Sequence, residues 1–237
     1  MISVLPNLSE QDTNVQNPFQ HIMIKTATLH FIFYLFLIPL VCNQSSTTKI
    51  PIETKQSGKE YRLIKLHYEN TSGEKAITTF FYDENGLNQR ARWELLDGTR
   101  SSENYHTLDK NGRLLVKYRE FSDGVISTVR YNYNKNGNLI SEYFERSDSV
   151  TGEVHYEYNS KGKLINAECR GLNGWFFGVI TYTYQEDGLM ISGELTKDVK
   201  PIGTISYQYD EFGNLKLEFW DFLNSWSQTF LYEYEKI

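Results

Sequence analysis

The stretch Tyr207–Leu215 reads YQYDEFGNL, with two tyrosines two residues apart, an acidic residue, a glycine three residues later and an apolar residue. The same arrangement occurs at 131–139 (YNYNKNGNL), 156–164 (YEYNSKGKL) and 182–190 (YTYQEDGLM). Six such motif glycines lie 26, 25, 25, 26 and 25 residues apart: Gly86, Gly112, Gly137, Gly162, Gly188 and Gly213. A period this constant predicts a repeat architecture in which each copy is one structural unit.

The residues before each motif glycine alternate in character. Positions four and six before the glycine are aromatic in most copies, and the position between them is mostly polar. Because successive strand side chains point to opposite faces, this pattern predicts a strand with one aromatic face. These rows are either a binding platform or the core, and we interpret them as core because paired aromatics on a sheet are usually buried.

Each motif also carries the chemistry of a tight turn. Asp or Asn three residues before a glycine is typical of a turn whose glycine adopts a positive φ. The predicted turn-forming residues are Asp83, Gly86, Asp109, Gly112, Asn134, Gly137, Asn159, Gly162, Gly188, Asp210 and Gly213. A second set of turns is expected between them, at Gly98, Gly124, Gly152, Gly174 and Gly203.

The repeats define the fold class. Two strands per 25-residue unit give about six units and roughly fourteen antiparallel strands over residues 61–237. We predict an all-β hairpin meander that forms an elongated, curved sheet, about 65 Å across if it is left open.

The motif YQYDEFGNL and its copies resemble the YD motif of RHS-type repeat proteins, in which Y-x-Y-D-x-x-G-x-L recurs. The layout with two turns per unit is also similar to the MORN-variant repeats of antitoxin-like proteins. Both resemblances imply successive β-hairpins. The RHS resemblance also implies a shell around a cargo domain, but six units are too few to enclose one. The MORN-variant resemblance implies an antitoxin or immunity function as an alternative.

The N-terminal residues indicate export. Residues 27–42 (ATLHFIFYLFLIPLVC) form an apolar run without formal charge, which is typical of a signal peptide and short for a spanning helix. Cys42, followed by a polar stretch, resembles a bacterial lipoprotein cysteine and is the predicted lipidation site. Ordinary secretion and an uncleaved single-span anchor are the alternatives. The predicted organisation is a doubtful extension (1–22) before a start at Met23, a signal (23–42), a linker (43–60) and the repeat domain (61–237).

Composition excludes several function classes. A net charge of −6 argues against nucleic-acid binding, and two cysteines form no zinc or disulfide framework. We expect neither metal nor cofactor, because Asp109–Gly112 (DKNG) lacks the glycine and glutamate positions of a calcium loop. Glu168 and Glu194 occupy equivalent positions in adjacent units, but the corresponding sites elsewhere include Tyr118, Tyr143 and Phe219. We therefore expect no catalytic residues and no enzymatic activity.

The remaining prediction concerns a partner. Aromatic residues gather in the last third of the chain, and exposed Trp and Tyr often anchor interfaces. The candidate partner-binding residues are Trp175, Phe177, Trp220 and Trp226. We expect a non-enzymatic cell-envelope protein, at the outer membrane, cell surface or periplasm, that binds an unknown protein or glycan.

Overall fold

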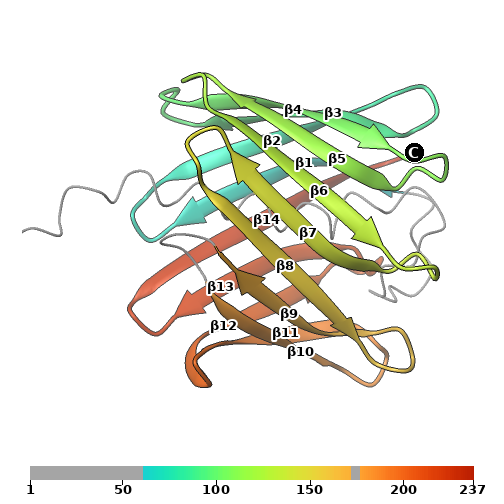
Figure 1. Ribbon diagram of the computed structural model, residues 1–237, viewed down its shortest axis with the longest axis vertical. Helices are drawn as coiled ribbons and strands as arrows, with labels where there is room; N and C mark the ends of the chain where they lie inside the picture. The colour runs from blue at the N-terminus through green and yellow to red at the C-terminus, as the bar shows by residue number, and fades with distance from the viewer. Residues whose placement is uncertain (1–60, 172–176) are drawn as a thin grey trace, which may run out of the picture.

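A computed structural model describes residues 61–171 and 177–237. The described chain forms a closed barrel of fourteen antiparallel strands, each paired with the strands next to it in sequence (Figure 1). The strands are β1 (Tyr61–Asn70), β2 (Lys75–Tyr82), β3 (Asn88–Leu95), β4 (Ser101–Leu108), β5 (Leu114–Phe121), β6 (Ile126–Tyr133), β7 (Leu139–Arg146), β8 (Thr151–Tyr158), β9 (Leu164–Arg170), β10 (Gly178–Tyr184), β11 (Met190–Lys197), β12 (Lys200–Tyr209), β13 (Leu215–Phe222) and β14 (Trp226–Lys236).

The first and last strands close the barrel. Strand β1 pairs with β14 from Tyr61↔Lys236 to Asn70↔Gln228, with one irregularity between Leu63 and Lys65. The predicted all-β hairpin meander is therefore confirmed, but the predicted elongated sheet is wrong. Strand twist accumulates over fourteen strands, and closure gives the two end strands the hydrogen-bond partners that an open sheet would leave unpaired.

The motif glycines lie in hairpin turns at one rim of the barrel, the motif rim. In each, the glycine N–H donates to the carbonyl three residues earlier, at 2.9–3.1 Å, and the glycine φ is positive. In five of the six turns the Asp or Asn side chain also accepts a backbone hydrogen bond from the residue two positions later. This is the pattern of a three-residue hairpin loop with a glycine bulge.

The second set of turns lies at the opposite rim, and two of the predicted positions are wrong. Gly152 and Gly203 are strand residues in β8 and β12. The chain instead turns at Ser149 and at Asp198–Val199, which take positive φ without glycine. Ser149 follows its motif glycine by the same 12 residues as Gly98 does. Gly203 serves packing, because a Cβ there would lie 2.4 Å from the Asp221 carbonyl oxygen. Gly174 lies outside the described residues.

The inward faces of the strands divide the barrel into two sectors. In the apolar sector, strands β8–β13, the buried inward residues are mostly apolar, including Val154, Ile180, Leu195 and Ile205. In the polar sector, strands β2–β7, many buried inward residues are polar or charged: Thr78, Asn88, Ser102, Asn104, Lys117, Arg119, Ser127, Glu142 and Arg146. The repeats therefore share one backbone arrangement, but the polarity of the side chains that they bury differs between the two sectors.

Candidate functional site at a gap in the tyrosine ladder

A row of tyrosine hydroxyls ties neighbouring strands together at the motif rim. Six tyrosines, each four residues before a motif glycine or at the corresponding place in β14, donate to a backbone carbonyl near the start of the preceding strand. The donor–acceptor distances are 2.5–3.0 Å, and we call this row the tyrosine ladder. Its members are Tyr82, Tyr133, Tyr158, Tyr184, Tyr209 and Tyr234. Burial raises the pKa of five of these hydroxyls, those from Tyr133 to Tyr234, above the ordinary value for tyrosine. Each of the five therefore keeps its proton and remains a hydrogen-bond donor at neutral pH.

Tyr82 belongs to this ladder by its hydrogen bond to the Leu63 carbonyl at 2.5 Å. The ladder is interrupted on β4, where Leu108 stands in place of tyrosine. The carbonyl that a tyrosine would bind there belongs to Asn88, and the imidazole of His106 takes it, with Nδ1 3.2 Å from the oxygen. The backbone pairing of β3 with β4 ends at Arg90↔Tyr105. Toward the motif rim from that pair, the His106 contact with the Asn88 carbonyl joins the two strands.

A cavity of about 530 Å³ lies at this gap. Aromatic and polar side chains from β2, the adjoining turn, β3 and β4 line it: Phe81, Tyr82, Asp83, Gln89, Arg90, Tyr105 and His106. We call this set the ladder-gap site. Phe81 and Tyr105 remain 37% and 46% exposed, so two aromatic side chains of the site are open to solvent.

The ladder-gap site also departs from the pattern of the repeat at three positions, those of Phe81, Arg90 and His106. In the other units the position of Phe81 holds a polar residue, and the position of His106 holds an aromatic ring. The position of Arg90 holds uncharged residues in those units. Because the turn and strand pattern continues unchanged through this part of the chain, the departures are not required by the fold.

Charged groups in the site are held by identifiable contacts. The guanidinium of Arg90 lies 4.5 Å from the centroid of the Phe81 ring and 3.9 Å from a carboxylate oxygen of Glu103. Asp83 accepts hydrogen bonds from Leu87 and Asn85 backbone N–H groups and from the Gln89 amide. These contacts, first among them the Leu87 hydrogen bond, hold the pKa of Asp83 below its usual range and keep the carboxylate charged.

His106 is neutral at physiological pH. Burial, and then the nearby charge of Lys117, lower its pKa to about 4. A carbonyl oxygen only accepts, so Nδ1 carries the proton that is donated to Asn88. Nε2 is then an acceptor, and it is buried with no hydrogen-bond partner among the described residues.

Behind the site, the polar sector continues into the barrel. Asn104 donates to the Ala91 carbonyl at 3.0 Å and accepts a hydrogen bond from Arg119 Nε. Lys117 pairs directly with His106 across β4 and β5, and Asn104 pairs with Arg119. Since buried charges are costly without partners, this network specifies one arrangement of β3, β4 and β5 around the gap.

Two buried glutamates, Glu142 and Glu218, are each hydrogen-bonded to a tyrosine hydroxyl. Glu142 accepts a hydrogen bond from Tyr156 at 2.7 Å, and Glu218 accepts one from Tyr232 at 2.9 Å and another from Trp220 Nε1. Burial raises the pKa of Glu142 to about 8 and that of Glu218 to about 7. The additional donor at Glu218 stabilises its charged form and accounts for the smaller rise.

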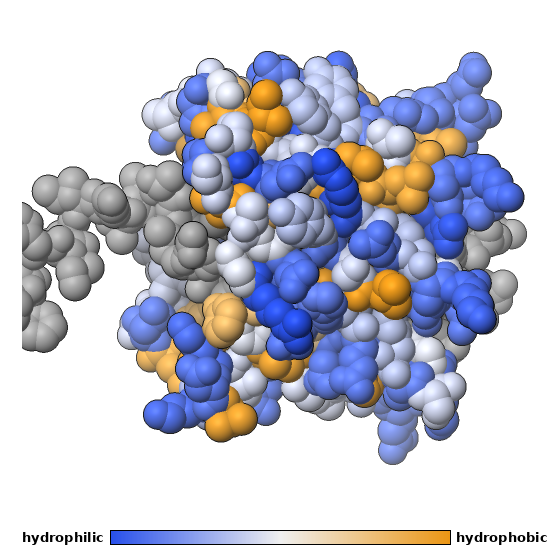
Figure 2. Space-filling view, in the orientation of Figure 1, coloured by the Kyte–Doolittle hydropathy of each residue, from blue (hydrophilic) through white to orange (hydrophobic). Residues whose placement is uncertain are grey.

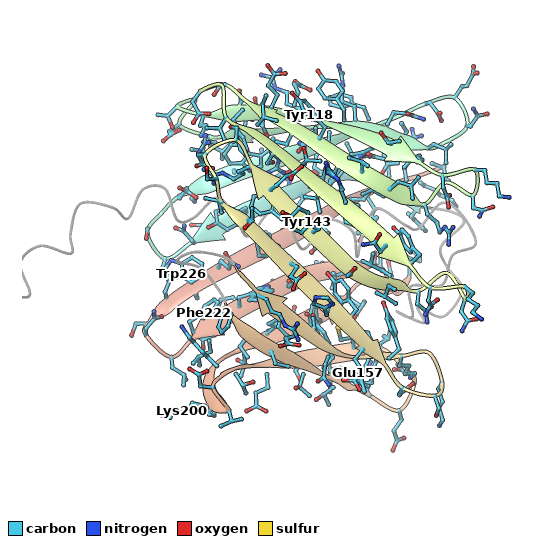
Figure 3. The ribbon with its side chains drawn as sticks, in the orientation of Figure 1. Tyr118, Tyr143, Glu157, Lys200, Phe222 and Trp226 are labelled. Atoms are coloured by element: carbon cyan, nitrogen blue, oxygen red, sulfur yellow. The ribbon has the colours of Figure 1, made fainter. Side chains whose placement is uncertain are left out.

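The predicted partner patch is not one surface. Trp220 is 3% exposed and faces inward, so its assignment as a surface anchor is wrong. Trp226 packs against Phe222 at the β13–β14 hairpin, with ring centroids 5.1 Å apart. Both residues are labelled in Figure 3. Phe177 is exposed just before β10, and Trp175 lies outside the described residues. Trp220 also stacks on Phe222 with ring centroids 6.2 Å apart, so Trp220, Phe222 and Trp226 form one row on the inward face of β13 and β14, and the Trp220 end of that row is buried.

The other predicted sites are placed as follows. Cys42 lies outside the described residues. The Asp109 carboxylate accepts hydrogen bonds from Asn111 and from the backbone and side chain of Arg113, as a turn residue does. Glu168 and Glu194 lie on the outer wall, the face of the sheet that points away from the barrel interior, and Glu168 is paired with Arg170. Within residues 61–171 and 177–237, no group of His, Cys, Asp and Glu side chains could hold a metal ion.

Sequence reasoning missed the ladder-gap site, although the sequence contained a signal for it. His106 and Leu108 replace aromatic residues that the other units keep, and Tyr105 and Phe81 add aromatic rings at outward positions. Comparing the copies position by position would have marked this region. The closeness of Phe81, Arg90 and Tyr105 follows from the strand pairing Phe81↔Arg90↔Tyr105.

These features define a class of protein: a closed antiparallel barrel built from YD-type hairpins. The chain belongs to the Teneurin YD-shell family, whose pattern it matches over residues 39–233. The resemblance to YD repeats is thereby confirmed. No curated protein matches the chain.

Several solved structures are similar to the chain at low identity. A porin-like protein from Bacteroides uniformis ATCC 8492 is 12% identical, with a TM-score of 0.46, and the match covers 73% of this chain and 98% of that one. The TcdB2-TccC3-TEV structure is 21% identical with a TM-score of 0.32 over 70% of this chain. The match spans only 9% of that much longer chain. Neither similarity decides the activity of this protein.

Proposed function

We propose that this chain is a non-enzymatic protein of the cell envelope that binds a partner through the ladder-gap site and the outer wall around it. The observation that carries the proposal is the concentration of exposed aromatic side chains and a cavity at the place where the tyrosine ladder is interrupted. The family membership supports a structural rather than a catalytic role.

The character of the outer wall supports a binding role in water. Charged pairs join neighbouring strands on it, such as Arg130–Glu145 at 2.9 Å and Lys65–Glu233 at 3.6 Å. Figure 2 shows that hydrophilic residues cover most of one face, with hydrophobic patches between them. Tyr118 on the polar sector is labelled in Figure 3. Its ring centroid lies 6.3 Å from that of Tyr105, which adds contact area of the kind that interfaces use.

The buried ionisable groups support a non-enzymatic role. Glu142 and Glu218 have the raised pKa values that acid catalysts often show, but each is fully buried and hydrogen-bonded to a tyrosine hydroxyl. Their contacts are those of structural groups that support the barrel interior.

Export through the N-terminal segment and lipidation at Cys42 remain part of the proposal. No helix within the described residues is long and apolar enough to cross a membrane. An antitoxin-like function stays an alternative, and no contact within the described barrel favours it.

The proposal is tested by expressing the full chain and its Cys42→Ala variant in a bacterial host with a labelled fatty acid. We expect the wild-type chain in the envelope fraction, carrying the label, and the variant without it. A cytoplasmic wild-type chain would overturn the proposed location, and equal labelling of both chains would overturn the anchor.

A further inference from the structure

We propose that the ladder-gap site binds a saccharide, one or two uncharged sugar rings in size. This inference deepens the proposed function by naming the class of partner, and it rests on that function. Three features of the molecule support it: the shape of the site, its polar groups and the pairing of both strand edges beside it.

The size and the walls of the cavity suit a sugar. A volume of about 530 Å³ lies within the range of small-ligand sites. Three aromatic side chains, Phe81, Tyr82 and Tyr105, line it. Because Arg90 lies over one face of Phe81 and Arg62 over one face of Tyr82, the exposed Tyr105 ring is the main apolar surface against which the C–H groups of a sugar can pack. Arg90 covers Phe81 at 4.5 Å, which places a polar donor beside an aromatic wall.

The polar groups of the site match hydroxyl groups. A hydroxyl both donates and accepts, and the site offers both functions within one cavity. Arg90 supplies N–H donors and Asp83 supplies carboxylate oxygens.

The charges of the site favour a neutral ligand. Asp83 would repel an anion, Arg90 would repel a cation, and His106 adds no charge. The lining groups therefore present one negative and one positive charge, each already held by contacts within the protein, so a ligand with only hydroxyl groups adds no charge that would need a partner.

The closed sheet disfavours an extended peptide. Peptides that bind sheets commonly add a strand to an exposed edge, where backbone groups provide most of the affinity. Each strand of the described barrel has a paired neighbour on both sides, and β3 and β4 are paired up to Arg90↔Tyr105 beside the site. The carbonyl of Asn88, which lies at the gap, is also occupied because His106 binds it.

The test uses the purified full chain and saturation-transfer NMR with a panel of neutral sugars: glucose, galactose, mannose, N-acetylglucosamine and their disaccharides. At about 1–10 mM sugar, this method detects the weak affinities expected of so few contacts. Two variants remove the site, Tyr105→Ala at an exposed ring and His106→Tyr, which restores the residue common in the other units. Tyr143→Ala is the matched control, because Tyr143 is exposed to a similar degree on β7, outside the site.

We expect at least one sugar to receive saturation from the wild-type chain and from Tyr143→Ala. The Tyr105→Ala and His106→Tyr variants should weaken that binding at least tenfold, with unchanged circular dichroism. No signal from any sugar, or an equal signal from Tyr105→Ala and Tyr143→Ala, would overturn the inference. Failure here leaves export and anchoring untouched, whereas a cytoplasmic chain that binds sugar would overturn only the proposed location.

Discussion

The two sectors of the barrel share one backbone arrangement but differ in the side chains that they bury. The apolar sector has a mostly apolar interior, and outward positions on β10–β12 are rich in Thr and Ser, such as Thr181 and Ser206. The polar sector buries Asn104, Lys117 and Arg119 and exposes Tyr105. The repeat thus determines where strands and turns lie, and it leaves the two faces free to differ between units.

This difference teaches where binding is to be sought. A unit that follows the pattern uses its tyrosine hydroxyl to tie two strands together. The unit containing Leu108 has lost that hydroxyl and, in the same place, has gained a cavity and exposed rings. Variation that the fold does not require is a better guide to function than the repeated tyrosines themselves.

The largest expected effect comes from exchanging residue types between the sectors at inward positions. Val154→Asn places an amide in the apolar sector, and we expect it to lower the free energy of unfolding by about 3 kcal/mol. Asn104→Val, the reverse change, removes the hydrogen bonds to Ala91 and Arg119 and should cost about 1–3 kcal/mol. Urea unfolding of both variants measures the two losses. A stabilising Asn104→Val would show that the polar interior is not required.

The second effect is a pH dependence that separates the two buried glutamates. A folded-state pKa of about 8 means that Glu142 keeps its proton in the folded protein while the unfolded chain loses it near 4.5. The unfolded state then binds fewer protons, so stability falls as pH rises from about 5 to 8. The slope approaches about 1.4 kcal/mol per pH unit where the two states differ by a full proton.

Unfolding by urea at several pH values checks this dependence. Glu142→Gln stays neutral, so we expect its stability to fall less than that of the wild type up to about pH 8. For Glu218→Gln the corresponding difference should end near pH 7. Parallel curves for wild type and Glu142→Gln would contradict the raised pKa.

A smaller effect concerns the tyrosine ladder. Tyr158→Phe removes the hydroxyl that binds the Leu139 carbonyl at 2.7 Å, and we expect a loss of about 1–2 kcal/mol. Tyr143→Phe removes an exposed hydroxyl outside the ladder and should change stability by less than about 0.5 kcal/mol. Thermal unfolding compares the two variants, and equal losses would show that the ladder does not stabilise the barrel.

The smallest effect concerns the β11–β12 hairpin. Val199 is a β-branched residue at φ 60° in the turn and is 96% exposed. Such a residue is strained at positive φ, and glycine is not. We expect Val199→Gly to stabilise the barrel by about 1 kcal/mol, seen as a higher Tm. A lower Tm would mean that the side chain stabilises the turn in a way its exposure does not reveal.

The sequence predicted the parts of the fold that depend on neighbouring residues. An Asp or Asn three residues before a glycine determines its turn locally, so the hairpins at Gly86 to Gly213 follow from the sequence. The turns at Ser149 and Asp198–Val199 lacked that signal because their residues adopt positive φ without glycine. Closure depends on twist accumulated over the whole sheet, and no single residue of β1 or β14 encodes it.

The candidate site was harder to predict because it depends on which face each aromatic residue occupies. Trp220 and Phe177 lie in the same aromatic-rich third of the sequence, but one is buried and the other exposed. Phe81 and Tyr105 are 24 residues apart in sequence and are brought together by β3, which pairs with both of their strands. Only the strand register shows that they share one wall.

The central claim is that the sheet closes through β1 and β14, because closure removes the free edges and leaves the outer wall as the place where a partner binds. Glu69 and Thr229 face each other across this junction on the outer wall. Replacing both with cysteine (Glu69→Cys with Thr229→Cys) and analysing the oxidised protein by mass spectrometry without reductant tests the claim directly. A closed barrel predicts an intramolecular disulfide between positions 69 and 229, because paired strand residues lie within disulfide range. An open sheet would hold these positions far apart, and the absence of that disulfide would contradict the account.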